Sequence, residues 1–109
     1  MSDISELQHE ALAFRDARDW AQFHNAKDLA AGLSIEAGEL LECFLWKDAK
    51  SADPAKVREE LADVLIYALL LAHEAKVDLP SAIREKLAKN ALKYPVDKAK
   101  GRADKYDQL

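Results

Sequence analysis

The sequence predicts an all-α fold, in which four helices pack antiparallel and complete their core in a homo-oligomer. Apolar residues recur at three- and four-residue steps along most of the chain, which is the helical period. Only three Gly and three Pro occur among 109 residues, too few for the tight turns of a sandwich or barrel. Half of the residues are apolar and a third are charged, a mix typical of soluble, helix-rich proteins. Because a chain this short buries only about 60–70% of its unfolded surface, long apolar helices often need a second copy to cover them.

The first helix is predicted from Ile4 to about Arg18, where apolar residues repeat at helical steps. Three polar residues can cap its start: Ser2, Asp3 and Ser5. The connection that follows, residues 19–25, breaks the period and contains Trp20, Phe23 and His24. Large aromatics in a connection either fill a core or stack on a flat ligand, and filling a core is the commoner case.

The second helix is predicted from Ala26 to Trp46, and the third from Pro54 to about Ala75. Pro54 suits the first turn of a helix because that turn needs no backbone donor. The connection between the two helices is short, so they should pack antiparallel.

The fourth helix should open at Pro80, continue to about Lys93 and be stopped by Pro95. The remaining residues are mostly charged. We therefore expect one domain over residues 1–95 and a charged, flexible tail over residues 96–109.

Charge and composition limit which kinds of partner the protein can bind and in which cellular compartment it is expected. A net charge of −4 leaves no surplus of Lys and Arg to neutralise a nucleic-acid backbone, so no nucleic-acid partner is expected. The longest apolar run, residues 64–72, falls short of the roughly 20 residues of a membrane span. No signal peptide is visible, and the single Cys43 cannot form an internal disulfide. We expect a cytoplasmic protein without a membrane partner.

Two carboxylate pairs at helical i, i+3 spacing carry the strongest chemical signal: Glu36 with Glu39, and Glu60 with Asp63. Most such pairs lie on solvated helix faces. Here both pairs share helix faces with apolar residues, so the helical step turns them towards the interior. Buried carboxylates without Lys or Arg beside them are costly unless they bind a metal. Oxygen ligands without His or Cys favour Mg²⁺, with Mn²⁺ as a substitute.

A polar stripe follows on the fourth helix at i, i+3, i+4, i+7 and i+8: Lys86, Lys89, Asn90, Lys93 and Tyr94. Taken alone, this pattern is typical of a solvated helix edge. Beside a magnesium site, it could bind a polyphosphate and stabilise the charge of a pyrophosphate leaving group. Tyr67, one turn beyond Asp63, could hydrogen-bond a sugar or a phosphate, or it is a core tyrosine.

The order Glu-x-x-Glu, a spacer of about twenty residues, then Glu-x-x-Asp resembles the all-α nucleoside triphosphate pyrophosphohydrolases of the MazG type. Further elements resemble the dCTP pyrophosphatase branch of that family: Phe14-Arg15-Asp16, Gln22-Phe23-His24, Trp46-Lys47, Val77-Asp78-Leu79-Pro80 and Lys93-Tyr94-Pro95. The matching elements together cover roughly residues 6–95. The spacer between Trp46 and Glu60 is shorter than that branch has, which puts a loop contribution to base choice in doubt.

The resemblance implies hydrolysis of a deoxynucleoside triphosphate to the monophosphate and pyrophosphate. It favours dCTP or a modified dCTP, with dATP or dUTP as alternatives, and implies a role in cleansing the nucleotide pool. Four carboxylates would hold Mg²⁺, and one of the first two would orient or deprotonate the attacking water: Glu36, Glu39, Glu60 and Asp63. Tyr67 would contact the sugar or the triphosphate. Three residues would frame the nucleobase: Trp20, His24 and Trp46. Four would contact the phosphates: Lys86, Asn90, Lys93 and Tyr94. The family also implies homodimers or homotetramers with pockets near the subunit interface.

Two other classes of protein could share some of these features. A non-catalytic helical dimerisation or regulatory module would explain the apolar helix faces, but it would not explain acidic residues on them. A di-iron carboxylate bundle uses Glu-x-x-His pairs, and neither carboxylate pair here has a His at that offset.

Overall fold

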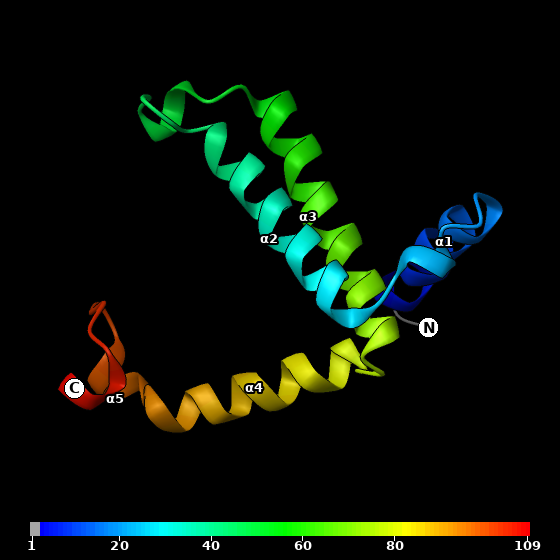
Figure 1. The fold of residues 1–109 in the computed structure, drawn as a ribbon. Helices are drawn as coiled ribbons and strands as arrows, with labels where there is room; N and C mark the ends of the chain where they lie inside the picture. Colours follow the sequence, from blue (N-terminus) through cyan, green and yellow to red (C-terminus); the bar gives the residue numbers. More distant parts are fainter. Residues whose placement is uncertain (1–2) are drawn as a thin grey trace. The chain divides into compact units, whose positions relative to one another are not determined.

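The computed structural model describes residues 3–109, and all regular elements in that range are helical (Figure 1). The all-α prediction is therefore confirmed. The chain divides into two compact units, one ending at Val77 and the other running from Asp78 to Leu109. None of the described helices is both long and apolar enough to cross a membrane.

The first unit opens with helix α1, Asp3–Ala17, which matches the prediction to within one residue at each end. Asp19 follows in the left-handed region at φ 55°, so the helix cannot continue. The connection contains a single 3₁₀ turn, Ala21–Phe23. The side chain of Asn25 then caps α2 by accepting a hydrogen bond from the amide of Asp28 at 2.9 Å. Ser2, one of the suggested caps of α1, lies outside the described residues.

Helix α2 spans Ala26–Glu42, so the predicted end at Trp46 is wrong by four residues. The amides of Cys43, Phe44 and Leu45 donate to carbonyls three residues back, which tightens the chain into turns. Trp46 then adopts φ 63° and leaves the helix. No Gly or Pro marks this end, so no stop signal in the sequence predicts it.

A 3₁₀ turn, Ala49–Ser51, leads to α3, Pro54–Glu74. Asp53 caps α3 by accepting a hydrogen bond from the amide of Ala55 at 3.0 Å, and Pro54 occupies the first turn as predicted. Helices α2 and α3 lie side by side as an antiparallel hairpin, and α1 packs more lightly on α3 (Figure 1). The side-chain amide of Gln8 ties α1 to α3 by donating to the carbonyl of Leu69 at 2.9 Å.

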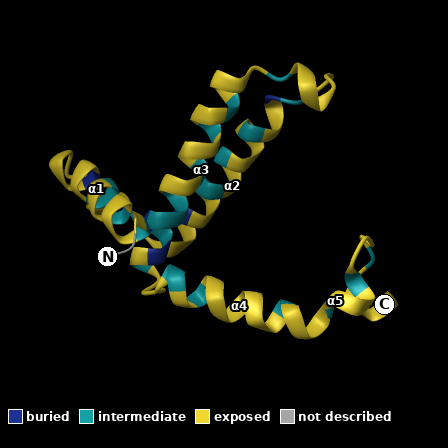
Figure 2. Cartoon of the chain, turned by 180° about the vertical axis from the view of Figure 1, so that it is seen from behind, coloured by how far each residue is buried: buried dark blue, intermediate teal, exposed yellow. Residues whose placement is uncertain are grey.

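The core of this unit is thin (Figure 2). Among the described residues, the buried apolar side chains are those of Leu29, Cys43, Leu70 and Ala72. Many large apolar side chains remain exposed on all three helices. Completion of the core by a second copy stays a prediction.

The second unit begins with α4, Leu79–Lys93, capped by Asp78, whose carboxylate accepts hydrogen bonds from the amide and hydroxyl of Ser81. Pro95 follows, and the tail contains a short helix α5, Val96–Ala99, and a 3₁₀ turn, η3, Tyr106–Gln108. The tail thus has helical turns where the sequence predicted a frayed segment. Its flexibility and the domain boundary at residue 95 stay predictions.

Candidate functional site

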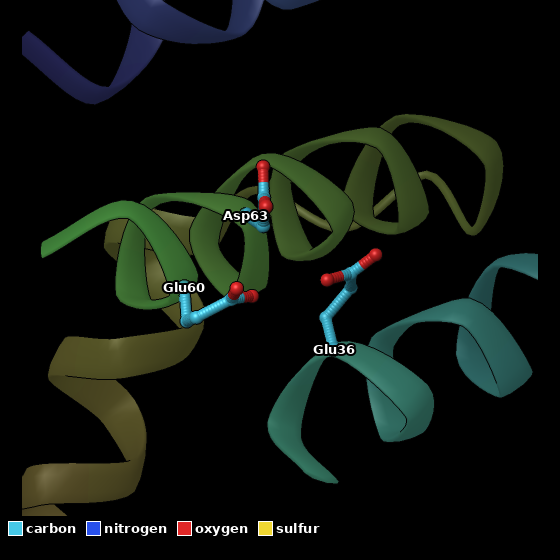
Figure 3. Close-up of side chains that lie close together, drawn as sticks. All are labelled: Glu36, Glu60 and Asp63. Atoms are coloured by element: carbon cyan, nitrogen blue, oxygen red, sulfur yellow. The ribbon is translucent and has the colours of Figure 1, made fainter. Parts of the chain in front are cut away.

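A cluster of carboxylates lies between α2 and α3 (Figure 3). Glu36 reaches from α2 towards α3, from which Glu60 and Asp63 project. Each of the three offers a carboxylate oxygen within 4.8 Å of the others, and we call them the carboxylate cluster. Glu39, one turn further along α2, is close enough to influence the pKa of both Glu36 and Glu60. The structure thus brings together three of the four predicted carboxylates, with Glu39 nearby. The expectation that both pairs turn towards the interior holds for Glu36 and Glu60, which are half-buried, and is wrong for Glu39 and Asp63, which are exposed on the surfaces of their helices.

The antiparallel register of the two helices creates this cluster. Four residues before Glu36, Gly32 lies so close to Tyr67 that an added Cβ would be 2.4 Å from the ring atom Cε1. Four residues before Tyr67 lies Asp63, so equal steps along the two helices pair Gly32 with Tyr67 and Glu36 with Asp63. The close approach at Gly32 therefore fixes which carboxylates face each other.

The electrostatics of the cluster favour a bound cation. The pKa of Glu36 is raised from 4.5 to about 7, first by the hydrogen bond that its protonated form makes with Glu39. Burial and repulsion from neighbouring carboxylates add to this rise. The pKa of Glu60 is raised mainly by burial and by repulsion from Glu39.

One basic residue does lie beside the cluster, contrary to the expectation from the sequence. The ammonium of Lys56 is 3.9 Å from Oε1 of Glu60, and it partly offsets the rise in that pKa. The Lys56 side chain is 62% exposed, whereas that of Glu60 is 14% exposed. A pair this long and this solvated contributes little, so the cluster keeps most of its mutual repulsion.

Two buried oxygens in the cluster have no hydrogen-bond partner among the described residues: Oε2 of Glu36 and Oε2 of Glu60. Such orphaned acceptors are costly unless something supplies positive charge. A hard divalent cation such as Mg²⁺ or Mn²⁺ prefers carboxylate oxygens and would satisfy both. The residues present therefore fit a divalent metal site.

A cavity of about 670 Å³ adjoins the cluster. It lies between α1, the connection of residues 19–25 (the aromatic connection) and α3. Asp63 belongs both to the wall of the cavity and to the carboxylate cluster. Its wall is mainly apolar and aromatic, as in sites for flat organic ligands. The lining residues are Leu7, Glu10, Ala11, Phe14, Arg15, Trp20, His24, Ala62, Asp63, Leu65, Ile66, Tyr67, Leu69 and Leu70.

Three predicted substrate-binding residues line this cavity: Trp20, His24 and Tyr67. Trp20 is 46% exposed and meets Phe14 edge to face at 5.9 Å between ring centroids. Nδ1 of His24 is buried and has no hydrogen-bond partner among the described residues. An aromatic face and an unsatisfied ring nitrogen are therefore both available to a ligand.

The other predicted substrate-binding residues are not among those that line this cavity. Trp46 is 99% exposed at the far end of the α2–α3 hairpin, where it borders a shallow depression with Lys47, Asp48 and Ser51. Four residues belong to the second unit, on or just after α4: Lys86, Asn90, Lys93 and Tyr94. Within that unit, Tyr106 contacts both Lys93 and Tyr94, with the ammonium 5.0 Å from its ring centroid. Their roles towards a substrate stay predictions.

Arg15 and Glu10 also line the cavity, although neither was predicted from the sequence to be a site residue. Both lie at helical steps from Leu7, so their position on the apolar face of α1 could have been predicted from the sequence. Arg15 is only 8% exposed and pairs with Asp16 at 2.9 Å and Glu74 at 3.1 Å. Its carbonyl accepts a hydrogen bond from the amide of Trp20 at 3.1 Å. Arg15 therefore ties α1, α3 and the aromatic connection together at the cavity wall.

Comparison with known proteins agrees with this arrangement. The chain matches the MazG-like family over residues 32–109. It is 40% identical to dCTP pyrophosphatase 1 of Bos taurus and 39% identical to that of Homo sapiens, in alignments that cover all of this chain and 68% and 67% of those proteins. A crystal structure of a pyrophosphatase from Archaeoglobus fulgidus has a TM-score of 0.78 and 38% identity, covering 87% of this chain and 94% of that chain. These matches confirm the resemblance that the sequence motifs predicted.

Proposed function

The chain belongs to the MazG-like family, and from this membership we propose that it is a Mg²⁺-dependent nucleoside triphosphate pyrophosphohydrolase. The observation that carries the proposal is a cluster of two half-buried carboxylates and one exposed carboxylate at the edge of an aromatic cavity. The two features share Asp63, so phosphates bound at a metal would place the nucleoside within reach of the cavity. The products would be a nucleoside monophosphate and pyrophosphate.

In the proposed mechanism, four carboxylates would hold the metal: Glu36, Glu39, Glu60 and Asp63. When bound, Mg²⁺ would neutralise phosphate charge and acidify water. Glu36 or Glu39 then orients or deprotonates the water that attacks the α-phosphorus. Trp20 stacks on the base, and His24 and Tyr67 bind its polar edge or the sugar.

We further propose dCTP or a modified dCTP as the substrate and cleansing of the nucleotide pool as the role. Support comes from relatives that are named dCTP pyrophosphatase 1 and are about 40% identical to this chain. Other deoxynucleotides such as dATP or dUTP remain alternatives. Bound phosphates would also contact four residues of the second unit: Lys86, Asn90, Lys93 and Tyr94.

We propose a homodimer or homotetramer as the active form. The exposed apolar side chains of all three long helices in the first unit support this. In such an assembly, Trp46 of one copy could frame the nucleobase in the cavity of another. This would reconcile its predicted role with its full exposure in a single chain.

The test is a panel of deoxynucleoside triphosphates, ribonucleotides and modified dCTPs assayed for pyrophosphate release with Mg²⁺. Asp63→Ala should reduce release by roughly a hundredfold or more, because a metal ligand is lost. It should not lower thermal stability, because repulsion within the cluster is relieved. The matched control is Glu59→Ala, which removes an exposed carboxylate of the same helix outside the cluster and should leave activity unchanged.

Two outcomes would contradict the proposal at different levels. No pyrophosphate from any nucleotide with Mg²⁺ or Mn²⁺ would refute the hydrolase and favour a non-catalytic helical dimerisation module, which the exposed apolar faces also suit. Equal rates with all deoxynucleotides would refute the dCTP preference and leave the hydrolase intact.

A further inference from the structure

The charged side chains of the cavity wall differ in whether they already have partners. Three such residues line it: Glu10, Arg15 and Asp63. Arg15 is held by Asp16 and Glu74, and Asp63 belongs to the carboxylate cluster. Glu10 makes no hydrogen bond or ion pair with any described residue, so its carboxylate is free to meet a ligand.

Glu10 lies on the face of α1 that lines the cavity. Leu7, Glu10, Ala11 and Phe14 follow each other at the spacing of one helix face, and all four line the cavity. The other three are apolar, so Glu10 is an isolated acceptor on an otherwise apolar stretch of wall. A ligand that fills the cavity would strip water from this carboxylate, which is costly unless the ligand donates a hydrogen bond.

The chemistry of a carboxylate limits what that ligand can present. An ionised carboxylate only accepts hydrogen bonds and repels phosphate oxygens. The phosphates belong with the metal at the carboxylate cluster, so Glu10 should meet the nucleoside. Cytosine and adenine carry an exocyclic amino group that donates, whereas uracil and thymine present a carbonyl oxygen at the matching position. A carbonyl oxygen against Glu10 would leave two acceptors facing each other.

We propose that Glu10 is a specificity-determining residue that selects cytosine and adenine, through their exocyclic amino groups, over uracil and thymine. The proposal rests on the proposed function, and it assigns base choice to a residue of α1 outside the aromatic connection. Sites built to donate or accept a hydrogen bond discriminate strongly, because the wrong ligand leaves a polar group unpaired.

The test compares kcat/KM for dCTP and dUTP with Mg²⁺ in the full chain and in Glu10→Gln. A Gln side chain can both donate and accept, so the variant should lose about tenfold or more of the dCTP-over-dUTP ratio, the size expected for one charge-assisted hydrogen bond. Activity on dUTP should be kept or raised, which also shows that the variant folds. Glu6→Gln is the matched control, since it makes the same charge change on the same helix outside the cavity, and its ratio should stay within about twofold of the wild type.

The outcomes separate this proposal from the one on which it rests. A ratio in Glu10→Gln within twofold of the wild type overturns the role of Glu10 while the hydrolase stands. Equal losses on dCTP and dUTP also overturn it, because they indicate a contact with the sugar. Should Glu10→Gln not fold, binding of dCMP and dUMP to Glu10→Ala, followed by tryptophan fluorescence in a Trp46→Phe background, decides the question, with loss of the dCMP preference expected. A wild type that cleaves no nucleotide refutes both proposals.

Discussion

The environment of Glu36 disfavours its ionised form unless a cation is bound. Its carboxylate lies with Glu60 and Asp63, and one of its oxygens is buried without a partner among the described residues. An unpaired acid in such a place either takes up a proton or binds a cation. Its raised pKa of about 7 is the first response, and metal binding would be the second.

The metal-free protein is expected to lose stability as the pH rises from about 4.5 to about 7. Because the pKa of Glu36 is raised from 4.5 to about 7, folding favours its protonated form. The resulting stabilisation is full below the unfolded pKa and is lost as the pH passes through the folded pKa. Thermal unfolding in the presence of a chelator, measured across this range, checks the trend.

Two companion measurements make this prediction specific. Glu36→Gln cannot titrate, so its thermal midpoint should vary less over the same pH range. Saturating Mg²⁺ should reverse the trend in the wild type, because metal binding favours the ionised carboxylates. An identical pH dependence in the variant and the wild type would show that Glu36 is not the titrating group.

At the scale of helices, much of the fold could be predicted and its details could not. Apolar periodicity and proline positions placed α1, α3 and α4 to within one residue at every end. The end of α2 was missed because turns with local hydrogen bonds, and not a Gly or Pro, terminate it. The spacing of Glu36, Glu39, Glu60 and Asp63 indicated the cluster, but periodicity could not show which turns of two helices face each other.

The close approach of α2 and α3 at Gly32 supplies that register, and it can be tested. In Gly32→Ala, the added Cβ would lie 2.4 Å from Cε1 and 2.9 Å from Cδ1 of Tyr67, so the ring or the helix must move. We expect a loss of about 1–3 kcal/mol in the free energy of unfolding, as in overpacked cores. KM for the nucleotide should also rise, because Tyr67 lines the cavity.

Gly38 offers the matched control within the same helix. A Cβ at Gly38 would meet nothing within 4 Å, so Gly38→Ala should stabilise the chain by up to about 1 kcal/mol through helix propensity alone. In the background Tyr67→Ala, the cost of Gly32→Ala should largely vanish. Equal effects of the two glycine substitutions on urea unfolding would contradict a special role for Gly32.

For the whole molecule, long helices surround a small core, so many apolar side chains would need a second copy of the chain to cover them. Four exposed apolar side chains illustrate it on α2 and α3: Ile35, Leu41, Leu61 and Leu65. Each is at least 47% exposed, and Ile35 reaches 63%. Apolar surface on this scale marks an interaction site or an aggregation liability. A chain of 12.2 kDa with so few buried side chains would be marginal alone.

We therefore expect the chain to sediment as a multiple of 12.2 kDa at about 10 μM, and its specific activity to fall when dilution dissociates it. Leu41→Glu together with Leu61→Glu should shift the species towards the monomer, because two charges would replace apolar contacts. Lys105→Glu, at an exposed position before the last 3₁₀ turn, adds a Glu outside the three long helices of the first unit and should leave the mass unchanged. A wild-type monomer with full specific activity would show that one chain builds the whole site, and Trp46 would then have no neighbouring cavity to frame.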